Sequence, residues 1–337
     1  MKEAIISKGP KVTIRDAPIP KAEKDLLVIK VAVSGSNPKD WKYPEWTGKE
    51  FNEGDDIAGT VHEIGPDAAA YGFKVGDRVA AFHEMRTGGG SYAEYAVAHA
   101  YTTFHLPEQT SFEEAATLPL AALTAVVGLY ASDRLALPEP WAPATEPTPL
   151  VVYGGASAVG AFVIKYAQRS NIHPIITVAG KGADFVESLI DRSKGDTIVD
   201  YRDGDEAVVA GIKKALKGEK LHYAYDAITE KGSYVNLSKV LEPGAKLTHV
   251  LPIKDEEIPE IKKVQTYVGN VHDGHKDLGL VHSRYLTRGL SEGWYKGHPY
   301  EVVPGGLEGI EGALKKLKEG KASAVKYVFR ISDTPGL

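Results

Sequence analysis

The sequence predicts an α/β protein with two domains, a barrel-like β domain and a doubly wound parallel sheet. Residues 1 to about 105 contain short strand-like segments separated by turn signals, a pattern typical of a barrel. From residue 150 onward, strand-like and helix-like segments alternate, which favours a parallel sheet with helices on both faces. The chain has 337 residues, which is enough for two domains of ordinary size.

The composition excludes several classes of protein. Hydrophobic residues make up 43% of the chain and charged residues 25%, a balance typical of soluble globular proteins. The formal net charge of -5 argues against a general electrostatic footprint for nucleic acid. No apolar run reaches the roughly 20 residues of a membrane helix, and the first residues lack the apolar core of a signal peptide. Cysteine is absent, which excludes disulfides, thiolate ligands and a cysteine nucleophile, so we expect a cytoplasmic protein.

The first domain is expected to consist of strands followed by a helical region. Segments 26–33, 57–65 and 92–97 are dense in β-branched or alternating residues and are predicted to be strands, and 75–82 is predicted to be a turn followed by a strand. Ser111, followed three residues later by Glu114, matches a capping box and predicts a helical region that runs to Tyr130. Five prolines from Pro138 to Pro149 then predict an exposed, semi-rigid loop, because each removes a backbone donor.

The second domain is expected to alternate strands with helices. The predicted strands are 150–153, 174–178, 196–199, 221–226, 245–250 and 264–268. The predicted helices are 158–170, 182–193, 204–217 and 231–241. A final helix at 306–319 precedes a strong strand at 324–331, which we expect to return to the first domain.

The turn between the first of these strands and the first helix predicts a phosphate site. A helix N-terminus carries unpaired N–H donors and partial positive charge, which together attract a pyrophosphate. Gly155 and Gly160 fall at the first and last glycines of a G-x-G-x-x-G pattern, with Ser157 in the middle position. We expect the Ser157 hydroxyl to bond to the pyrophosphate as well. The turn consists of Gly154, Gly155, Ala156, Ser157, Ala158, Val159 and Gly160.

The residues after the second strand predict NADPH as the cofactor. An acidic residue at this point favours the ribose 2′-OH of NAD, whereas a basic residue favours the 2′-phosphate of NADP. No carboxylate appears before Asp184, and Lys181 lies 21 residues after Gly160, where the discriminating residue is expected. The alternative is that Lys181 is a solvated lysine at a helix start.

Four stretches in this order and spacing point to a known family. They are Asn37-Pro38-Lys39-Asp40-Trp41-Lys42; Gly54-Asp55-Asp56-Ile57-Ala58-Gly59-Thr60-Val61 with Val75-Gly76-Asp77-Arg78-Val79; Gly89-Gly90-Ser91-Tyr92-Ala93-Glu94-Tyr95; and Ala115-Ala116-Thr117-Leu118-Pro119 with Leu123-Thr124-Ala125. Over nearly its whole length the chain resembles the zinc-free branch of the medium-chain dehydrogenase/reductase superfamily. This branch includes quinone oxidoreductases, zeta-crystallin and fungal trans-acting enoyl reductases, and the proline-rich insertion looks most like the last group.

The resemblance implies a fold and the absence of a catalytic zinc. It implies a GroES-like domain from residues 1–122 and 273–337 around a Rossmann domain of residues 123–272. Zinc-dependent relatives place a cysteine where Asn37 stands and Gly-His-Glu where Gly54-Asp55 stands, and they carry a lobe of four cysteines. His272 and His275 form the closest histidine pair, and we expect loop histidines there rather than a metal site.

The resemblance also implies the catalytic residues, and each has a simpler structural alternative. Asn37 would face the nicotinamide, unless it is only a turn residue before Pro38. Asp40, Lys42 and Tyr43 would line the substrate cleft, where a desolvated Lys42 can donate a proton or bond a carbonyl; the alternative is a surface lysine. Thr124 would lie near the nicotinamide ribose or carboxamide, or bond to its own helix backbone.

Further cofactor contacts are implied along the second domain. Tyr201 would contact the 2′-phosphate, unless it is a strand-end aromatic residue, and Lys326 would approach the cofactor phosphates. Ligands of open α/β sheets bind outside the carboxyl ends of the strands. Residues at two such ends are therefore expected to meet the nicotinamide. They are His249 and Val250 after the fifth strand, and Val268, Gly269 and Asn270 after the sixth.

These observations predict a metal-independent NADPH-dependent reductase that transfers hydride to a quinone or to the activated double bond of an enone. A conjugated acceptor spreads the developing charge to oxygen, so a few neutral donors and cofactor positioning can suffice. The alternative within the enzyme class is a trans-acting enoyl reductase on a carrier-bound polyketide, with a polyketide synthase as partner. The alternative from another class is an NADPH-binding crystallin-like or RNA-binding protein. The resemblance allows a homodimer or a monomer.

Overall fold

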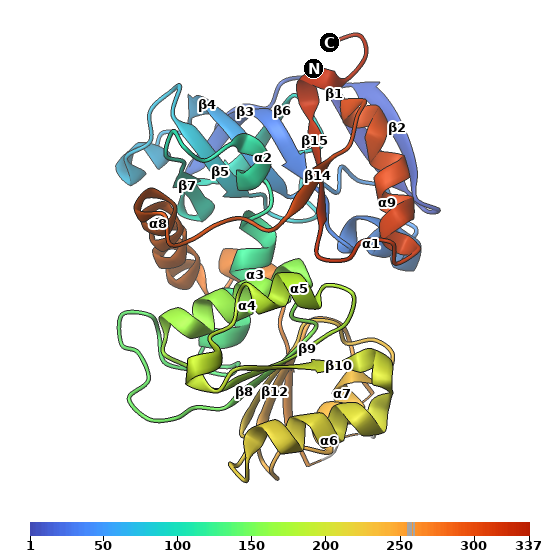
Figure 1. Cartoon of the computed structure of the whole chain (residues 1–337). Helices are drawn as coiled ribbons and strands as arrows, with labels where there is room; N and C mark the ends of the chain where they lie inside the picture. The colour runs from blue at the N-terminus through green and yellow to red at the C-terminus, as the bar shows by residue number, and fades with distance from the viewer. Residues whose placement is uncertain (255–257, 259) are drawn as a thin grey trace. The chain divides into compact units, whose positions relative to one another are not determined.

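The computed structural model describes residues 1–254, 258 and 260–337, which divide into two compact units. Unit 1 contains Met1–Leu120 and Val271–Leu337, and unit 2 contains Ala121–Asn270. The sequence places both boundaries two residues later, after residues 122 and 272. Unit 1 is therefore assembled from the two ends of the chain, whose termini both belong to it (Figure 1).

A seven-stranded sheet forms the frame of unit 1. Its order is β14-β15-β3-β4-β5-β7, and β6 also pairs with β3. Because β3 pairs with β4, β6 and β15, the predicted return of the last strand to the first domain is confirmed. A separate two-stranded sheet joins β1 to β2. The strands are β1 (Lys2–Ser7), β2 (Lys11–Asp16), β3 (Leu26–Gly35), β4 (Asp56–Ile64), β5 (Arg78–Phe82), β6 (Tyr95–His99), β7 (Thr103–His105), β14 (Tyr300–Val302) and β15 (Lys326–Arg330).

Four helices accompany this sheet, and the last of them helps to close the core. Helix α9 buries Ile310, Ala313 and Leu314, at helical spacing, in an apolar cluster with β1, β3, β4 and β15. At about 25 cal/mol per Å² of apolar surface, such burial provides the main stabilisation of the unit. The helices are α1 (Lys39–Thr47), α2 (Phe112–Ala115), α8 (Lys276–Glu292) and α9 (Ile310–Lys318).

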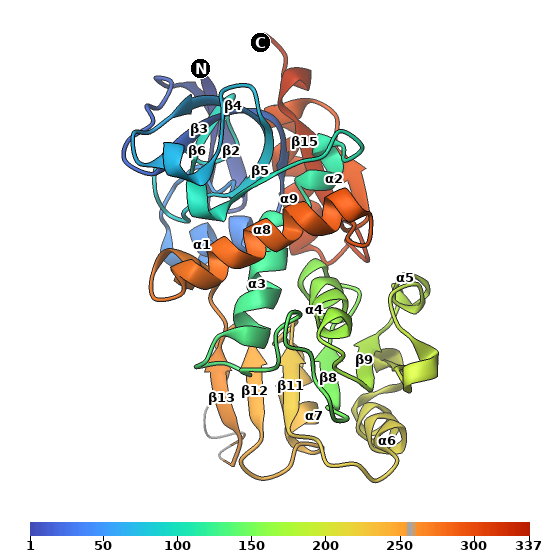
Figure 2. The same ribbon diagram turned by 90° about the vertical axis from the view of Figure 1, so that its left-hand side faces the viewer.

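Unit 2 contains a fully parallel six-stranded sheet, in which Figure 2 shows β13, β12, β11, β8 and β9 side by side. Its order is β10-β9-β8-β11-β12-β13, so the chain runs outward from β8 in one direction and from β11 in the other. The switch point between β8 and β11 is where ligands bind in open sheets of this kind. The strands are β8 (Leu150–Tyr153), β9 (Ile175–Ala179), β10 (Thr197–Asp200), β11 (Tyr223–Asp226), β12 (Lys246–His249) and β13 (Lys262–Gln265).

Helices cover both faces of this sheet, as the sequence predicts. On one face, Val151, Ile176 and Ala224 share an apolar cluster with Val208 of α6 and Leu237 of α7. On the other, α3 approaches Tyr225 so closely that a Cβ on Gly128 would lie 2.3 Å from the Tyr225 ring. The helices are α3 (Pro119–Tyr130), α4 (Ala158–Arg169), α5 (Ala183–Glu187), α6 (Asp205–Leu216) and α7 (Ser233–Ser238).

Several element boundaries differ from the sequence prediction for local reasons. Helix α5 ends at Glu187 rather than 193, and the Asp191 side chain then accepts from Ser193 N–H and starts a separate turn. Helix α7 begins at Ser233 rather than 231, because Lys231 has φ = 55° and Gly232 has φ = 80°. Strand β6 starts at 95 instead of 92, and β13 covers 262–265 instead of 264–268 in order to pair with β12.

The capping prediction at Ser111 is half confirmed. The Ser111 hydroxyl accepts from Glu114 N–H at 3.1 Å and caps α2. The Glu114 carboxylate, however, accepts from Gly297 N–H at 2.9 Å, so it holds a distant loop. The helical stretch Phe112–Tyr130 is long and apolar enough to cross a membrane by composition alone, but 83% of its most apolar window is buried within the protein. This burial is typical of core helices.

Candidate functional site

The predicted phosphate turn is present in unit 2, and its glycines are required by close contacts. Gly154 follows β8 with φ = 84°, a conformation that favours glycine. A Cβ on Gly155 would lie 1.9 Å from Thr177 Oγ1, and one on Gly160 would lie 2.2 Å from the Gly154 carbonyl oxygen. Side chains are therefore excluded at all three positions. The backbone of the turn is left open to a ligand.

Three backbone donors of this turn point to an anion site. The Ser157 hydroxyl caps α4 by accepting from Gly160 N–H at 3.0 Å. Within the described part of the chain, no group accepts from the N–H groups of Ala156, Ala158 or Val159. These donors, together with the dipole of the 12-residue helix α4, match the chemistry of a pyrophosphate. A hydroxyl that accepts one bond can still donate another, so the predicted bond from Ser157 to phosphate remains a prediction.

The residues after β9 supply a cation and an aromatic ring beside the same sheet edge. Lys181 is exposed, and no ion pair in the described residues involves it. The Tyr201 ring packs over Gly180, because a Cβ there would lie 2.5 Å from Tyr201 Cε1, yet half of its surface is exposed. The neighbouring Arg202 is held by Asp200, whose pKa falls to about 2 because Arg202 bonds to it. Lys181 and Tyr201 are thus the groups in this region that are placed to meet a ligand.

The other residues predicted to contact the cofactor in unit 2 lie at the carboxyl edge of the sheet. His249 ends β12 and is 5% exposed, with its Nδ1 2.7 Å from the Leu251 carbonyl oxygen. Val250 N–H donates to the Asp226 carbonyl at 3.2 Å. Val268, Gly269 and Asn270 form a short 3-10 turn, in which Asn270 Oδ1 accepts from Arg134 at 3.1 Å.

Thr124 is also part of unit 2. It is 6% exposed and lies on α3, where its carbonyl accepts from the Tyr225 hydroxyl at 2.8 Å. This bond ties α3 to the centre of the sheet, since Tyr225 lies on β11. The nicotinamide role predicted for the Thr124 side chain remains a prediction.

Unit 1 brings together Asn37 and Lys326 around a residue that sequence analysis did not single out, Asp56. Asn37 Nδ2 donates to Asp56 Oδ2 at 2.7 Å, and Lys326 Nζ contacts the same oxygen at 2.5 Å and Asn37 Oδ1 at 3.1 Å. All three side chains are at most 4% exposed. Lys326 is therefore bonded to a carboxylate inside unit 1, a different partner from the cofactor phosphates expected for it. Asn37 keeps one amide N–H for a further acceptor.

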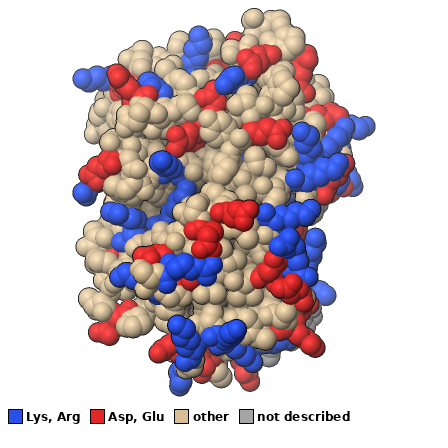
Figure 3. Space-filling model, in the orientation of Figure 1, with Lys and Arg blue, Asp and Glu red and all other residues tan. Residues whose placement is uncertain are grey.

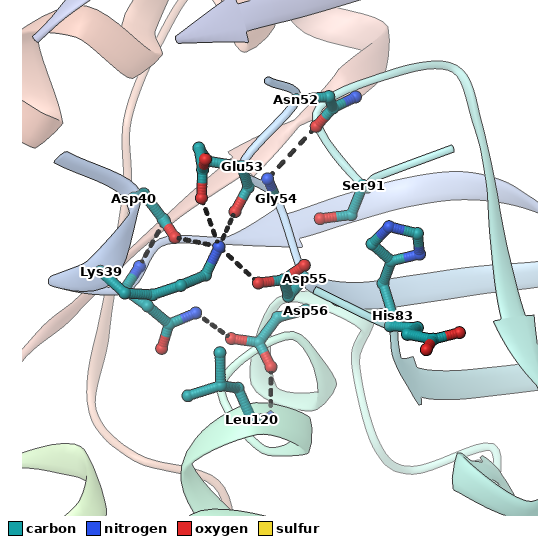
Figure 4. Close-up of polar contacts among 12 residues, drawn as sticks. Lys39, Asp40, Asn52, Glu53, Gly54, Asp55, Asp56, His83, Ser91 and Leu120 are labelled. Carbon is teal, nitrogen blue, oxygen red and sulfur yellow. Dashed lines mark hydrogen bonds and ion pairs between the residues drawn. The ribbon is translucent and has the colours of Figure 1, made fainter. Parts of the chain in front are cut away.

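A second cluster surrounds the Lys39 ammonium, as Figure 4 shows. Lys39 Nζ lies 2.5 Å from Asp55 Oδ2, 2.9 Å from Glu53 Oε2, 2.7 Å from the Glu53 carbonyl oxygen and 3.3 Å from Asp40 Oδ1. Asp40 Oδ2 also accepts from the Tyr92 hydroxyl at 2.6 Å. Burying one ammonium among three carboxyl groups requires that some of them stay protonated.

The electrostatics of this cluster follow from burial and from the surplus of carboxyl groups. Burial raises the pKa of Asp55 to about 8 and that of Asp40 to about 6, although Lys39 acts in the opposite direction on both. Burial also acts to lower the pKa of Lys39, but Asp55, Asp40 and Glu53 outweigh it and raise that pKa above its ordinary value. The ammonium thus stays charged, and the cluster holds a proton near neutral pH.

Helix α1 carries the remaining predicted site residues of unit 1. Lys42 is 7% exposed, and its ammonium lies 5.4 Å from the Trp41 ring centroid and 6.0 Å from that of Trp46. The ring of Tyr43 lies 6.4 Å from that of Phe51. Lys42 is therefore not the ordinary surface lysine of the alternative interpretation, because aromatic rings shield its charge.

Most of this network is not evident from the sequence, for a simple reason. Glu53, Asp55 and Asp56 are three acidic residues in four positions at the start of β4, a pattern that usually lies on a solvated surface. Only the fold shows that all three are at most 2% exposed. The sequence feature that could have indicated their burial is their position beside Gly54, immediately before a strand of apolar residues.

The described residues contain no group of three or more His, Cys, Asp or Glu side chains arranged to hold a metal ion. His272 of the predicted loop pair instead lies 3.0 Å from the Tyr101 hydroxyl through Nδ1 and stacks on Phe82. Burial lowers its pKa to about 3.

Comparisons with known proteins agree with this arrangement. Residues 23–108 match the model of the alcohol dehydrogenase GroES-like domain. The trans-enoyl reductase fsr4 of Gibberella fujikuroi is 50% identical over 316 residues, which cover 92% of each chain. The chain belongs to the trans-enoyl reductase family. Another member, resD of Aspergillus sclerotiorum, is 30% identical over 98% of this chain and all of its own.

Solved structures show the same fold. The CurK enoyl reductase superposes with a TM-score of 0.76 at 21% identity, over 97% of this chain and 98% of its own. A mycobacterial quinone oxidoreductase gives a TM-score of 0.74 at 19% identity, over 98% and 99%. The predicted fold class, a GroES-like domain with a Rossmann domain, is confirmed, and so is membership of the medium-chain dehydrogenase/reductase superfamily. The chain is an oxidoreductase of the enoyl and quinone reductase group, and a nicotinamide cofactor is implied.

Proposed function

We propose that this protein is an NADPH-dependent trans-enoyl reductase, which reduces the carbon–carbon double bond of an α,β-unsaturated thioester carried by a polyketide synthase. The observation that carries the proposal is the 50% identity to a trans-enoyl reductase over 92% of both chains. The quinone oxidoreductases match at about 20% identity and therefore share the fold without specifying the acceptor.

The residues of unit 2 fit NADPH. A Cβ added at Gly155 or Gly160 of the turn would lie only 1.9 or 2.2 Å from a neighbouring oxygen, and the N–H groups of Ala156, Ala158 and Val159 suit a pyrophosphate. Lys181 and the half-exposed Tyr201 suit the 2′-phosphate, since no carboxylate follows β9 before Asp184 and Asp200 beside Tyr201 is paired with Arg202. When bound, NADPH supplies the hydride that adds to one carbon of the double bond.

The residues of unit 1 supply the acceptor side of the reaction in this proposal. Reduction of the double bond also needs a proton at the second carbon, and a donor for the thioester oxygen on which charge develops. Lys42, shielded by Trp41 and Trp46, can donate a proton, and Tyr43 beside it can bond the oxygen. The remaining N–H of Asn37 can serve as a neutral donor.

Steady-state NADPH oxidation over a panel of acceptors tests this function. We expect turnover with a crotonyl-pantetheine thioester, in the presence of EDTA, at a higher kcat/KM than with an ortho-quinone or a 2-alkenal. Turnover of the quinone alone would overturn the enoyl assignment in favour of quinone reduction. Binding of NADPH without turnover of any acceptor would instead favour a non-enzymatic binding protein.

A second assay tests the carrier. If the thioester acts from a carrier domain, the same acyl group attached to a phosphopantetheinylated carrier should be reduced at a higher kcat/KM than the free pantetheine thioester. Equal values would remove the synthase from the proposal. RNA is the alternative macromolecule, and on the face drawn in Figure 3 basic and acidic side chains are interspersed rather than gathered in one basic patch. Salt-dependent RNA binding would contradict the carrier assignment.

A further inference from the structure

Asp56 joins three segments that are far apart in the sequence. It begins β4 and is fully buried. Its Oδ1 accepts from Leu120 N–H at 2.6 Å (Figure 4). Its Oδ2 accepts from Asn37 Nδ2 at 2.7 Å and from Lys326 Nζ at 2.5 Å. A carboxylate has about four lone-pair sites, so one side chain can hold all three donors.

The bond to Leu120 is a helix cap supplied from a distant strand. Helix α3 begins at Pro119, so Leu120 N–H is among the first four donors, which lack an acceptor within the helix. The carboxylate satisfies that donor and places negative charge at the positive end of the helix. The same helix carries Thr124. The position of its first turn is therefore set by Asp56.

The bond to Asn37 fixes the turn before α1. The Asn37 amide is held at both ends, by Asp56 through Nδ2 and by Lys326 through Oδ1. Its backbone N–H donates to Asp40 Oδ2 at 2.7 Å, which links the turn to the first residues of the helix. Helix α1 follows, and Lys42 lies in its first turn.

We propose that Asp56 is a positioning residue for the reduction. With one carboxylate it holds two segments of unit 1, the turn before α1 and Leu120 at the start of α3. Lys326 balances its charge, so that the carboxylate can remain buried. The proposal rests on the enoyl reductase function proposed above and adds a residue that does not itself touch the substrate.

A matched control separates positioning from stability. Asp196 in unit 2 is also buried, at 1% exposure, and accepts from Ile175 N–H, Asp191 N–H and His173 Nδ1 at 2.7 to 3.0 Å. It lies before β10, at the amino edge of the sheet, and holds no segment of unit 1. Asp56→Asn and Asp196→Asn should therefore lower the melting temperature by comparable amounts.

Their kinetics should differ. Displacement of a reacting group by about 1 Å can cost on the order of 100-fold in rate. For Asp56→Asn we expect kcat for the enoyl thioester to fall roughly 10- to 100-fold, with the KM for NADPH within about threefold of the parent value. Asp56→Glu, which keeps the charge and both acceptors, should recover part of kcat. Asp196→Asn should keep kcat within about twofold per folded molecule. Equal losses of kcat in Asp56→Asn and Asp196→Asn, or no loss in Asp56→Asn, would overturn the proposal.

Hydrogen exchange gives a readout that does not depend on turnover. The amides of residues 118 and 120–124 should exchange at least about tenfold faster in Asp56→Asn than in the parent, since a lost bond of about 1.4 kcal/mol corresponds to tenfold. They should stay unchanged in Asp196→Asn. If the parent reduces no acceptor, the proposed function fails, whereas the exchange result still decides whether Asp56 holds α3. Unchanged exchange in Asp56→Asn would remove the positioning role by itself.

Discussion

The candidate sites of the two units consist of different chemical groups, backbone N–H groups in unit 2 and charged side chains in unit 1. In unit 2 the phosphate turn consists of seven consecutive residues, and its contacts come from backbone N–H groups and from the absence of side chains at Gly154, Gly155 and Gly160. In unit 1 the network around Asp56 and Lys39 consists of buried charged side chains from distant segments. A backbone site tolerates no added atom, whereas a charge network tolerates changes of shape more readily than changes of charge balance.

The largest effect should come from adding one methyl group to the turn. In Gly160→Ala the new Cβ would meet the Gly154 carbonyl oxygen at 2.2 Å, so the backbone of the turn must shift. We expect the dissociation constant of NADPH, measured by fluorescence titration, to rise by more than about 100-fold, or 2.7 kcal/mol.

Gly312→Ala is the matched control for this change. Gly312 lies inside α9, and no atom lies within 4 Å of a Cβ built on it. This variant should leave NADPH affinity unchanged and stabilise the protein by up to about 1 kcal/mol. If Gly160→Ala bound NADPH as tightly as Gly312→Ala, the turn would not be the phosphate site.

The same contrast explains which parts of the molecule could be predicted from the sequence. The turn, its strand and α4 are continuous in sequence, so periodicity and glycine spacing located them within one or two residues. Helix α8 was not predicted, although its buried positions from Gly279 to Leu290 are at helical spacing, because a glycine-bearing segment with His272 and His275 suggested a loop. The Asp56 network could not be predicted, because its residues meet only in the folded chain: Lys326 lies 270 residues from Asp56 in the sequence.

The next largest effect concerns the side chain that should select the cofactor. Lys181→Ala removes one charged bond to the 2′-phosphate, worth about 1.5–3 kcal/mol, so NADPH affinity should fall roughly 10- to 100-fold. The affinity for NADH, which lacks this phosphate, should stay within about twofold. Lys194→Ala, another exposed lysine of unit 2, should change neither. Equal affinities of the parent for NADPH and NADH would contradict the assignment of Lys181.

The charge network of unit 1 should show itself in the pH dependence of stability. Burial raises the pKa of Asp55 to about 8 in the folded protein, against 3.8 for an ordinary aspartate. A raised pKa means that the folded state binds the proton more tightly, so this stability is complete below about pH 4 and is lost as the pH rises through about 8. Between pH 7 and 9 the free energy of unfolding should therefore fall.

Asp55→Asn should flatten this decline, because it keeps a neutral side chain of the same shape. At pH 9 we expect Asp55→Asn to exceed the parent by at least about 1.4 kcal/mol, the value of one pKa unit, in urea denaturation. The exposed Asp67→Asn removes the same formal charge and should leave the slope unchanged. Between about pH 4 and 6 the slope should be shallower, because the lowered pKa values of His83 and His272 oppose the raised pKa values of Asp40 and Asp55. A parent slope of zero between pH 7 and 9 would contradict the buried proton.

The smallest effect separates the two roles of Ser157, the one side chain on which the backbone site depends. Its hydroxyl caps α4 through Gly160 N–H, and removal of such a cap in Ser157→Ala should cost about 1 kcal/mol of stability. Ser157→Gly should cost only a few tenths, because glycine is itself tolerated at this position. Both variants lack the hydroxyl that would donate to the pyrophosphate, so both should bind NADPH about fivefold more weakly if that bond exists. Loss of the cap should make Ser157→Ala less stable than Ser157→Gly, whereas loss of the ligand bond should weaken NADPH binding equally in both variants. If Ser157→Gly binds NADPH as tightly as the parent, the hydroxyl serves the helix alone, and the phosphate site of unit 2 consists entirely of backbone.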